Sequence, residues 1–188
     1  MIIVAFRNFI CFIGLLLASP IICIAAFCIF LEDGFPIFFK QQRIGKKEKP
    51  FTIYKIRTMP KNTPEVGTHI AEQEFKLKTG VFIRKTKLDE LHQLINVIKG
   101  DINLVGPRPS LYNQTELRNA RSVKNIFDAK PGITGLAQVL NYDMSNPLKL
   151  AEIDNIYINN QSFKMNVIIL MATFFEYPKR YLRKKFIK

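Results

Sequence analysis

The sequence has no tryptophan, few cysteines and few acidic residues. Asp and Glu number 15 against 28 Lys and Arg, so the 188-residue chain carries a net charge of +13 at pH 7. This deficit of acid indicates an anionic partner: nucleic acid, acidic lipid or a phosphorylated substrate. The three cysteines, Cys11, Cys23 and Cys28, form no CxxC pair and no other metal-ligand spacing. They predict buried hydrophobic side chains in a reducing compartment and no thiolate metal site.

The chain is also rich in apolar residues. Hydrophobic residues make up 48% of it and 16 of its residues are Phe. A basic and strongly apolar composition favours a protein of the membrane surface. No recognisable base-reading motif accompanies the basic residues, which argues against a nucleic-acid partner. We find no repeat, no low-complexity segment and no linker, so we expect a single domain over residues 1–188.

A long uncharged segment lies near the N-terminus. Residues 8–31, "NFICFIGLLLASPIICIAAFCIFL", contain no charged side chain. At ~1.5 Å per residue a helix of this length could cross a hydrocarbon core of ~30 Å. However, Ser19 and Pro20 lie in its middle, and a proline removes a backbone donor and bends or breaks a helix. Each half alone would be too short to cross.

Basic residues flank this segment on both sides: Arg7, Lys40, Arg43, Lys46, Lys47 and Lys49. Because cytoplasmic flanks are enriched in Lys and Arg, both ends are expected on the cytoplasmic side. This pattern favours a re-entrant membrane hairpin over residues 8–31, a helix, a break and a helix. Two alternatives stay open from these residues: a kinked single span, and a cleaved signal peptide ending near Ala25 and Ala26.

The rest of the chain predicts an α+β fold that is mainly helical with one small β-hairpin. The predicted elements are a hairpin of 36–45 with 51–59, a mostly irregular 60–80 with a short helix near 70–77, a helix at 87–99, a glycine turn and short extended run at 130–139, and a helix from Pro147 to about Asn160. Expected caps are Thr86 and Asn146 at helix starts and Gly100 at a helix end.

The C-terminal part combines apolar and basic residues. Ser162 is a candidate N-cap, and the apolar stretch 167–175 is too short to span a bilayer. The residues that follow are strongly basic: Lys179, Arg180, Arg183, Lys184, Lys185 and Lys188. We expect C-terminal helices that lie at the interface of an anionic membrane. The alternative is an ordinary core helix followed by a solvated charged tail.

Asp89 and Glu90 are the strongest candidates for chemistry, although two adjacent acids are a weak signal by themselves. Thr86-x-x-Asp89 also resembles a capping box, in which the acids would only stabilise the first turn of a helix. Arg108 stands between two prolines that fix its backbone, which suits a guanidinium that holds phosphate oxygens. His92 shares a helix face with Asp89, so an Asp-His metal pair is conceivable, but no other ligand spacing supports it.

Several ordered motifs together resemble a known family. They are the N-terminal apolar segment with its Ser-Pro break, "QQRIG", "FTIYKIRTM", "KLDELHQLINVIKGDINLVGPRP", "KPGITGLAQV" and "EIDNIYINNQS". The chain is similar over nearly its whole length to bacterial sugar transferases of the monotopic phosphoglycosyl transferase type. The resemblance implies that Ser19 and Pro20 make the membrane helix re-entrant. It implies a place on the cytoplasmic face of the bacterial inner membrane.

The resemblance also implies a reaction and roles for four residues. Asp89 would be the nucleophile and would also approach a Mg²⁺ ion. It would attack the β-phosphorus of a UDP-sugar, expel UMP and leave a covalent phospho-sugar enzyme. Glu90 would help to activate undecaprenyl phosphate as the acceptor. Arg108 would hold phosphate, and Arg84, five residues before the nucleophile, would assist it.

The resemblance implies partners as well: a UDP-sugar, undecaprenyl phosphate, anionic membrane lipids and downstream glycosyltransferases of a glycan pathway. An N-acetylated hexosamine is the expected donor sugar. Leu136 and His92 depart from residues that are frequent in the family, which leaves that sugar open. The short chain is expected to be a minimal catalytic form. The competing hypothesis is a non-catalytic basic scaffold that binds anionic lipid and has no need of Asp89 or Glu90.

Overall fold

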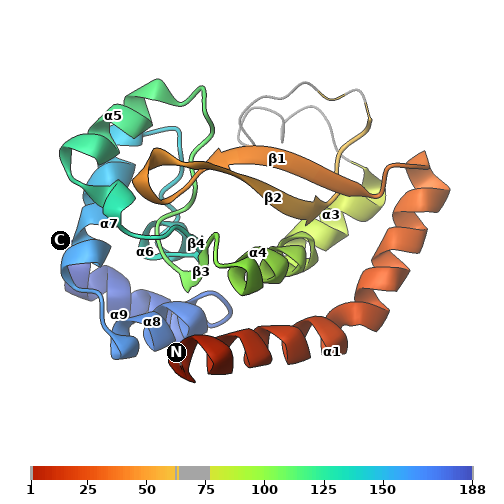
Figure 1. Ribbon diagram of the computed structural model, residues 1–188, viewed down its shortest axis with the longest axis horizontal. Coiled ribbons are helices and arrows are strands. Elements are labelled where there is room, and N and C mark those ends of the chain that lie inside the picture. The colour runs from red at the N-terminus through yellow and green to blue at the C-terminus, as the bar shows by residue number, and fades with distance from the viewer. Residues whose placement is uncertain (1, 62, 64–76, 188) are drawn as a thin grey trace. The chain divides into compact units, whose positions relative to one another are not determined.

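A computed structural model describes residues 2–61, 63 and 77–187 of the chain (Figure 1). The chain divides into two compact units, each described here by itself. Unit 1 comprises Met1–Gln41 and Thr52–Gly100, and unit 2 comprises Gln42–Phe51 and Asp101–Lys188. The described residues are mainly helical with two small sheets, which confirms the α+β class. The prediction of a single domain over residues 1–188 stays a prediction.

Strands β1 (Phe38–Ile44) and β2 (Pro50–Ile56) form the predicted hairpin. Backbone hydrogen bonds from Arg57 N to Ile37 O and from Gly45 N to Lys49 O mark its antiparallel pairing. The basic tip between the strands is a 3₁₀ turn, η1 (Lys46–Glu48). The hairpin prediction is therefore confirmed.

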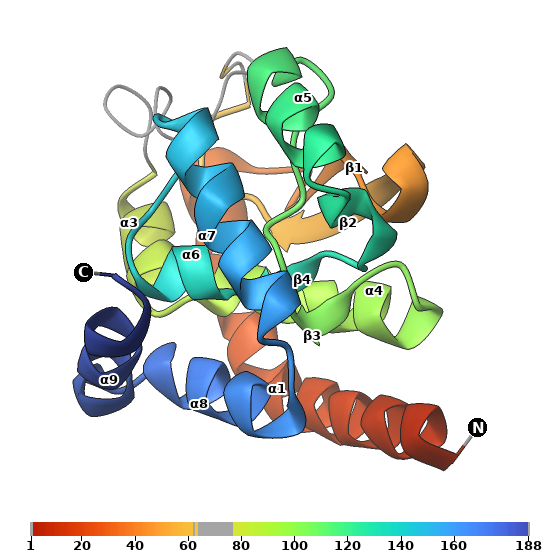
Figure 2. The same ribbon diagram turned by 90° about the vertical axis from the view of Figure 1, so that its left-hand side faces the viewer.

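Unit 1 is built on the helix α1 (Ile2–Asp33), which contains Pro20. The helix is continuous but visibly bent (Figures 1 and 2), and we attribute the bend to this proline. Ser19 Oγ donates to the carbonyl of Leu16 at 2.7 Å. The expected break between two helices is thus a bend within one helix, because the lost hydrogen bond at a proline need not end a helix.

One side of α1 packs on the rest of unit 1 and much of the remainder is exposed. Ile22, Ala25 and Ile29 are buried with residues of β2, α3 and the segment before α3: Ile56, Leu77 and Ile83. Exposed apolar side chains include Phe9, Phe12, Leu17, Ile24, Phe27 and Leu31. The helix is long and apolar enough to cross a membrane, and its bare apolar surface indicates membrane association.

The cysteine prediction needs a correction. Cys11 is buried, but Cys23 is exposed and Cys28 is only half-buried. All three lie in α1, and only the part of that helix that packs on unit 1 is covered by protein. Composition alone could not distinguish burial by protein from exposure on an apolar helix.

Three short helices follow in the part of unit 1 from residue 77 onward: α3 (Lys78–Lys85), the 3₁₀ helix η2 (Leu88–Gln93) and α4 (Leu94–Lys99). The predicted helix at 87–99 is therefore two consecutive helices. Gly100 ends α4 with a φ of 85°, as expected of a C-terminal glycine. Residues 78–80, expected to be irregular, begin α3, and the helix expected near 70–77 falls almost wholly outside the described residues.

Unit 2 contains a parallel strand pair and six further helical elements. The strands are β3 (Asn103–Val105) and β4 (Gly132–Thr134), with Asn103 opposite Gly132 and Val105 opposite Thr134. The helices are α5 (Thr115–Val123), the 3₁₀ turn η3 (Ile126–Asp128), α6 (Leu136–Val139), α7 (Pro147–Asn159), α8 (Phe163–Ala172) and α9 (Glu176–Phe186). A Cβ on Gly132 would lie 2.1 Å from Gly106 N, so only glycine allows this close approach.

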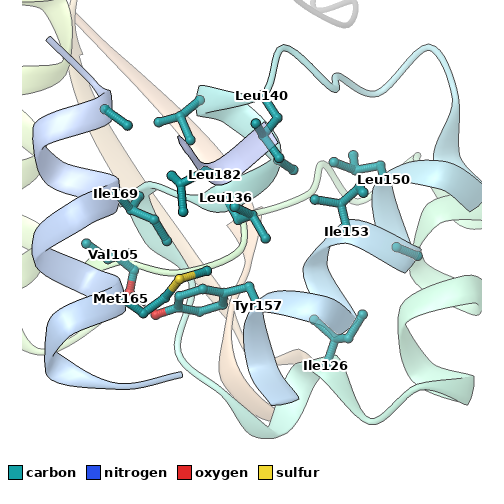
Figure 3. Packing of buried hydrophobic residues seen from close by; sticks show 14 of the residues in the cluster. Val105, Ile126, Leu136, Leu140, Leu150, Ile153, Tyr157, Met165, Ile169 and Leu182 are labelled. Atoms are coloured by element: carbon teal, nitrogen blue, oxygen red, sulfur yellow. Dashed lines mark hydrogen bonds between the residues drawn. The ribbon is translucent and has the colours of Figure 1, made fainter. Parts of the chain in front are cut away.

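The core of unit 2 joins α6, α7, α8 and α9 to β3 (Figure 3). Figure 3 shows Tyr157 and Met165 side by side, with Leu136, Ile169 and Leu182 around them. The Tyr157 hydroxyl lies 3.2 Å from the Val105 carbonyl oxygen, and burial raises the pKa of Tyr157 to about 12. These contacts hold the strand that leads into Gly106 and the Pro-Arg-Pro segment.

Two predicted helix starts in unit 2 are confirmed, and the expectation for residues 130–139 is confirmed in part. Asn146 accepts a hydrogen bond from Lys149 N at the start of α7, and Ser162 accepts one from Met165 N at the start of α8. The short extended run expected within 130–139 is found as β4, but residues 136–139 form the short helix α6. The basic C-terminal segment forms the helix α9, on which Tyr177 and Tyr181 are exposed.

Candidate active site

The Asp-Glu pair lies in the first turn of η2. Lys87, with a φ of 57°, turns the chain from the end of α3 into this 3₁₀ helix. Thr86 is the last residue of the preceding turn, and its hydroxyl donates to the carbonyls of Phe82 at 2.9 Å and Ile83 at 3.1 Å. The capping-box interpretation of Thr86 and Asp89 is therefore wrong, because that hydroxyl serves the end of α3.

Asp89 is a largely buried carboxyl group among charges from three elements. Only 9% of it is exposed. Burial raises the pKa of Asp89, and the neighbouring charge of Glu90 raises it further, while Lys55 on β2 and Arg84 on α3 oppose this rise. Unit 1 therefore brings together Asp89, Glu90 and Arg84, three of the candidate residues named from the sequence, and adds Lys55.

Lys55 was not predicted as a site residue. In the sequence it is one basic residue in a strand, "FTIYKIRTM", and strand lysines are common on solvated surfaces. Its place near Asp89 depends on the packing of η2 and α4 against the hairpin. Asn96 contributes to this packing, because its fully buried amide donates to Thr52 O at 2.7 Å and accepts from Tyr54 N at 3.4 Å.

The C-terminal end of α1 fixes the helix that carries Arg84. The carboxylate of Glu32 accepts hydrogen bonds from Lys78 N at 2.6 Å and from Thr79 N at 2.9 Å, so it stabilises the start of α3. Arg84 Nε in turn donates to Thr58 Oγ1 at 2.7 Å. The long apolar helix α1 and the charges around Asp89 thus belong to one connected structure.

His92 offers little support for a metal pair with Asp89. Its ring lies against Phe38 with the centroids 4.6 Å apart, and burial lowers its pKa. Within residues 2–61, 63 and 77–187 there is no group of three or more His, Cys, Asp or Glu side chains that could hold a metal ion. A zinc site built from three or more such side chains is therefore not present in this part of the chain.

The adjacent carboxylates of Asp89 and Glu90 do suit a different kind of metal binding. Magnesium usually keeps several waters and binds through one or two carboxylates together with substrate phosphates. Such an ion needs no cluster of three protein ligands. The residues present therefore fit Mg²⁺ better than they fit zinc.

Arg108 belongs to unit 2, where it lies half-buried in the loop after β3. Arg43 lies near the end of β1, is 3% exposed and donates from Nη1 to Pro109 O at 3.2 Å. Burial and the like charge of Arg108 lower the pKa of Arg43 to about 9. Unit 2 therefore holds two guanidinium groups close together, which is a favourable setting for an anion.

Residues 2–180 match the model of the bacterial sugar transferases. The chain belongs to the bacterial sugar transferase family. It is 41% identical over 155 residues to the uncharacterized sugar transferase EpsL of Bacillus subtilis, covering 82% of this chain and 76% of that protein. This membership agrees with the resemblance carried by the sequence motifs.

Two larger relatives bear the names of specific transferases. The undecaprenyl-phosphate galactose phosphotransferase of Salmonella typhimurium is 37% identical over 85% of this chain and 37% of its own length. The UDP-N-acetylgalactosamine-undecaprenyl-phosphate N-acetylgalactosaminephosphotransferase of Aeromonas hydrophila is 34% identical over 86% of this chain and 40% of its own length. The chain thus spans well under half of these relatives. The two relatives are named for different sugars, although their sequence identities to this chain are similar.

The buried charge at Asp89 generates a prediction about stability. Because burial raises its pKa above that of the unfolded chain, the folded state binds this proton more tightly. Stability therefore falls as pH rises through the window between the two pKa values, and the full penalty is present above the folded pKa. Asp89→Asn removes the penalty, so we expect its melting temperature at pH 7.5, measured in detergent without divalent cations, to exceed that of the wild type.

The matched control is Glu116→Gln, which changes an exposed acid at the start of α5 and should leave the melting temperature unchanged. The difference between Asp89→Asn and wild type should shrink as the pH is lowered toward 4. A melting temperature of Asp89→Asn below that of wild type at pH 7.5 would contradict the inferred penalty.

Proposed function

We propose that this chain is a membrane phosphoglycosyl transferase. It moves a sugar-1-phosphate from a UDP-sugar to undecaprenyl phosphate, releases UMP and so initiates the synthesis of a surface glycan. The observation that carries the proposal is the buried carboxylate of Asp89 beside Lys55, Arg84 and Glu90. The names of the two larger relatives, which are undecaprenyl-phosphate sugar phosphotransferases, support it.

In the first step a carboxylate oxygen of Asp89 attacks the β-phosphorus of the UDP-sugar. The bond between that phosphorus and the oxygen bridging to the α-phosphorus breaks, and UMP leaves with the bridging oxygen. The product is an acyl phosphate that joins Asp89 to the sugar. Asp89 is suited to this step because a carboxylate is ionised at neutral pH and needs no base to attack.

In the second step an oxygen of undecaprenyl phosphate attacks the same phosphorus and displaces the Asp89 carboxylate. The product is a sugar linked to undecaprenol through a diphosphate, and Asp89 is regenerated. Glu90 helps to activate the acceptor phosphate by accepting its proton. Two successive half-reactions let one small site serve a soluble donor and a lipid acceptor in turn.

Positive charge is essential because the nucleophile and the diphosphate are both anionic. Lys55 and Arg84 supply positive charge beside Asp89. Arg108, in the Pro-Arg-Pro loop, binds a phosphate of the substrate. Asp89, with Glu90 adjacent to it, would hold Mg²⁺. When bound, this ion would neutralise charge on the diphosphate and on the leaving UMP.

The proposed place of the enzyme is the cytoplasmic face of the bacterial inner membrane. Helix α1 would enter the membrane from that face, turn back at the Pro20 bend and leave on the same side. The protein would then be monotopic. The exposed Phe174, Phe175 and Tyr177 together with the basic residues of α9 would lie on the anionic lipid surface. The product would there be available to downstream glycosyltransferases.

An N-acetylated hexosamine is the proposed donor sugar. The named N-acetylgalactosamine transferase of Aeromonas hydrophila supports it, and the galactose enzyme of Salmonella typhimurium keeps UDP-hexoses in the test. Donor choice should therefore be measured with a panel that contains both classes.

The activity test is UMP release by the detergent-purified protein with undecaprenyl phosphate, magnesium chloride and that panel of UDP-sugars. Wild type should release UMP with at least one donor. Asp89→Asn should lose about a thousandfold or more of this rate because the attacking group is gone. Glu116→Gln changes an exposed acid in the first turn of α5 that has no role in the proposed reaction, so it should keep the full rate.

Full turnover by Asp89→Asn would refute the assignment of the nucleophile. Two results together would favour the alternative function. The first is that no donor gives UMP. The second is that the protein binds anionic liposomes in a way that weakens with salt and is unchanged by substitution of Asp89 or Glu90. That alternative is a basic membrane-surface scaffold, and the exposed aromatic and basic side chains of α9 favour it.

The proposed topology predicts that both ends of α1 face the cytoplasm. In a variant with the native cysteines replaced, Val4→Cys should react with a membrane-impermeant maleimide in inverted vesicles and not in intact spheroplasts. Lys47→Cys at the hairpin tip is the cytoplasmic control. Labelling of Val4→Cys only from the spheroplast side would show a spanning helix instead.

A further inference from the structure

The loop that carries Arg108 is held by its carbonyl groups. Four consecutive residues each accept a hydrogen bond from a different donor: Pro107 O from Gly132 N at 2.9 Å, Arg108 O from Arg121 Nη1 at 2.8 Å, Pro109 O from Arg43 Nη1 at 3.2 Å, and Ser110 O from Ile44 N at 2.9 Å. Two of these donors are backbone amides and two are arginines. Pro107 and Pro109 have fixed φ angles as well, so this backbone has little freedom.

Arg121 is the most deeply buried of these donors. It lies on α5 and is 2% exposed. Its Nη2 lies 2.5 Å and its Nε 3.0 Å from Asp154 Oδ2, so its third nitrogen, Nη1, points at the carbonyl of Arg108. Asp154 on α7 is also 2% exposed. One planar guanidinium therefore joins α5, α7 and the Pro-Arg-Pro loop.

A buried ion pair is an expensive way to hold two helices together. Removing two charges from water costs much of what their attraction returns, and apolar residues of similar volume often stabilise a protein equally well. The contact to Arg108 O is different, because only a fork of several fixed donors can bind a carboxylate and a carbonyl at once. The geometry thus gives this pair a use that an apolar replacement could not supply.

We propose that Arg121, oriented by Asp154, is a positioning residue that sets the place from which the Arg108 side chain reaches the phosphate of the substrate. This inference rests on the proposed function for its consequence. Arg121 acts through the Arg108 backbone and has no contact with substrate. A displaced Arg108 would bind phosphate in the wrong place.

The decisive variant is Arg121→Lys. Lysine keeps the positive charge beside Asp154, but its compact ammonium cannot reproduce the fork that reaches Arg108 O at the same time. We expect kcat/KM for the UDP-sugar to fall about ten- to a hundredfold, as is typical when a binding group is misplaced. Asp154→Asn should lower it in the same direction, because the guanidinium loses the charge that orients it.

The chain offers a matched control on the same helix. Arg118 on α5 also donates to a backbone carbonyl, that of Tyr112 at 3.2 Å, and also pairs with a carboxylate, that of Glu48 at 2.9 Å. Neither partner belongs to the Pro-Arg-Pro loop. Arg118→Lys should therefore leave kcat/KM unchanged.

A double-mutant cycle separates positioning from simple stabilisation. If Arg121 acts through Arg108, then Arg121→Lys should have little further effect on kcat/KM in an Arg108→Gln background. A purely structural role would give the same loss in both backgrounds. Equal losses, or no loss in the wild-type background, would overturn the proposal.

Hydrogen exchange gives a readout that needs no activity. Arg121→Lys should speed amide exchange in a peptide covering residues 106–111, while Arg118→Lys should not. If wild type releases no UMP but this exchange still changes, the proposed function fails and the positioning of the loop stands. Unchanged exchange at 106–111 in both Arg121→Lys and Asp154→Asn overturns the inference whatever the activity.

Discussion

Asp89 is an acidic group with only 9% of its surface exposed, and the structure opposes the cost of its charge by placing Lys55 and Arg84 near it. Most of unit 1 contributes to this arrangement. The hairpin brings Lys55, α3 brings Arg84, and η2 brings the carboxylate itself. Burial strengthens the interactions between the charges in the site, because water that would screen them is excluded. The same burial makes the group costly for stability, which is a usual consequence of preparing a site for chemistry.

The two units fix the backbone around their basic side chains in different ways. In unit 1 the end of α1 stabilises the start of α3 through Glu32, so the long apolar helix also supports the helix that carries Arg84. In unit 2 the loop of Arg108 is held by four carbonyl contacts and two prolines. A phosphate-binding arginine benefits from such a fixed backbone, since each flexible bond in the arm lowers the precision of binding. In both units the backbone that carries a basic side chain is held by hydrogen bonds.

Local signals in the sequence were sufficient for several elements. Asn146 and Ser162 start helices, Gly100 ends one, and the alternating strands form the hairpin, because each depends on neighbouring residues only. The local signal at Thr86 was misleading, because it also depends only on neighbouring residues. Its spacing to Asp89 fits a capping box, but its hydroxyl closes α3, and the left-handed Lys87 separates the two helices. The pattern alone cannot show which of two adjoining helices a threonine serves.

Contacts between distant segments were beyond the sequence. The parallel pairing of β3 with β4, the place of Lys55 beside Asp89, and the link from Asp154 through Arg121 to Arg108 each join residues that lie far apart in the chain. The family motifs gave Asp89, Glu90, Arg84 and Arg108 as candidate site residues but gave no reason for the residues that support them. Those supporting residues became visible only through burial and hydrogen bonding.

The central claim is that Asp89 forms a covalent bond to the sugar phosphate. The most direct measurement is mass spectrometry of the protein after incubation with its UDP-sugar and magnesium chloride in the absence of any lipid acceptor. The account predicts an added mass of one sugar phosphate on the peptide that contains Asp89, and its loss when undecaprenyl phosphate is added. An enzyme that transfers sugar phosphate to the lipid but never carries this adduct would contradict the account and indicate direct transfer.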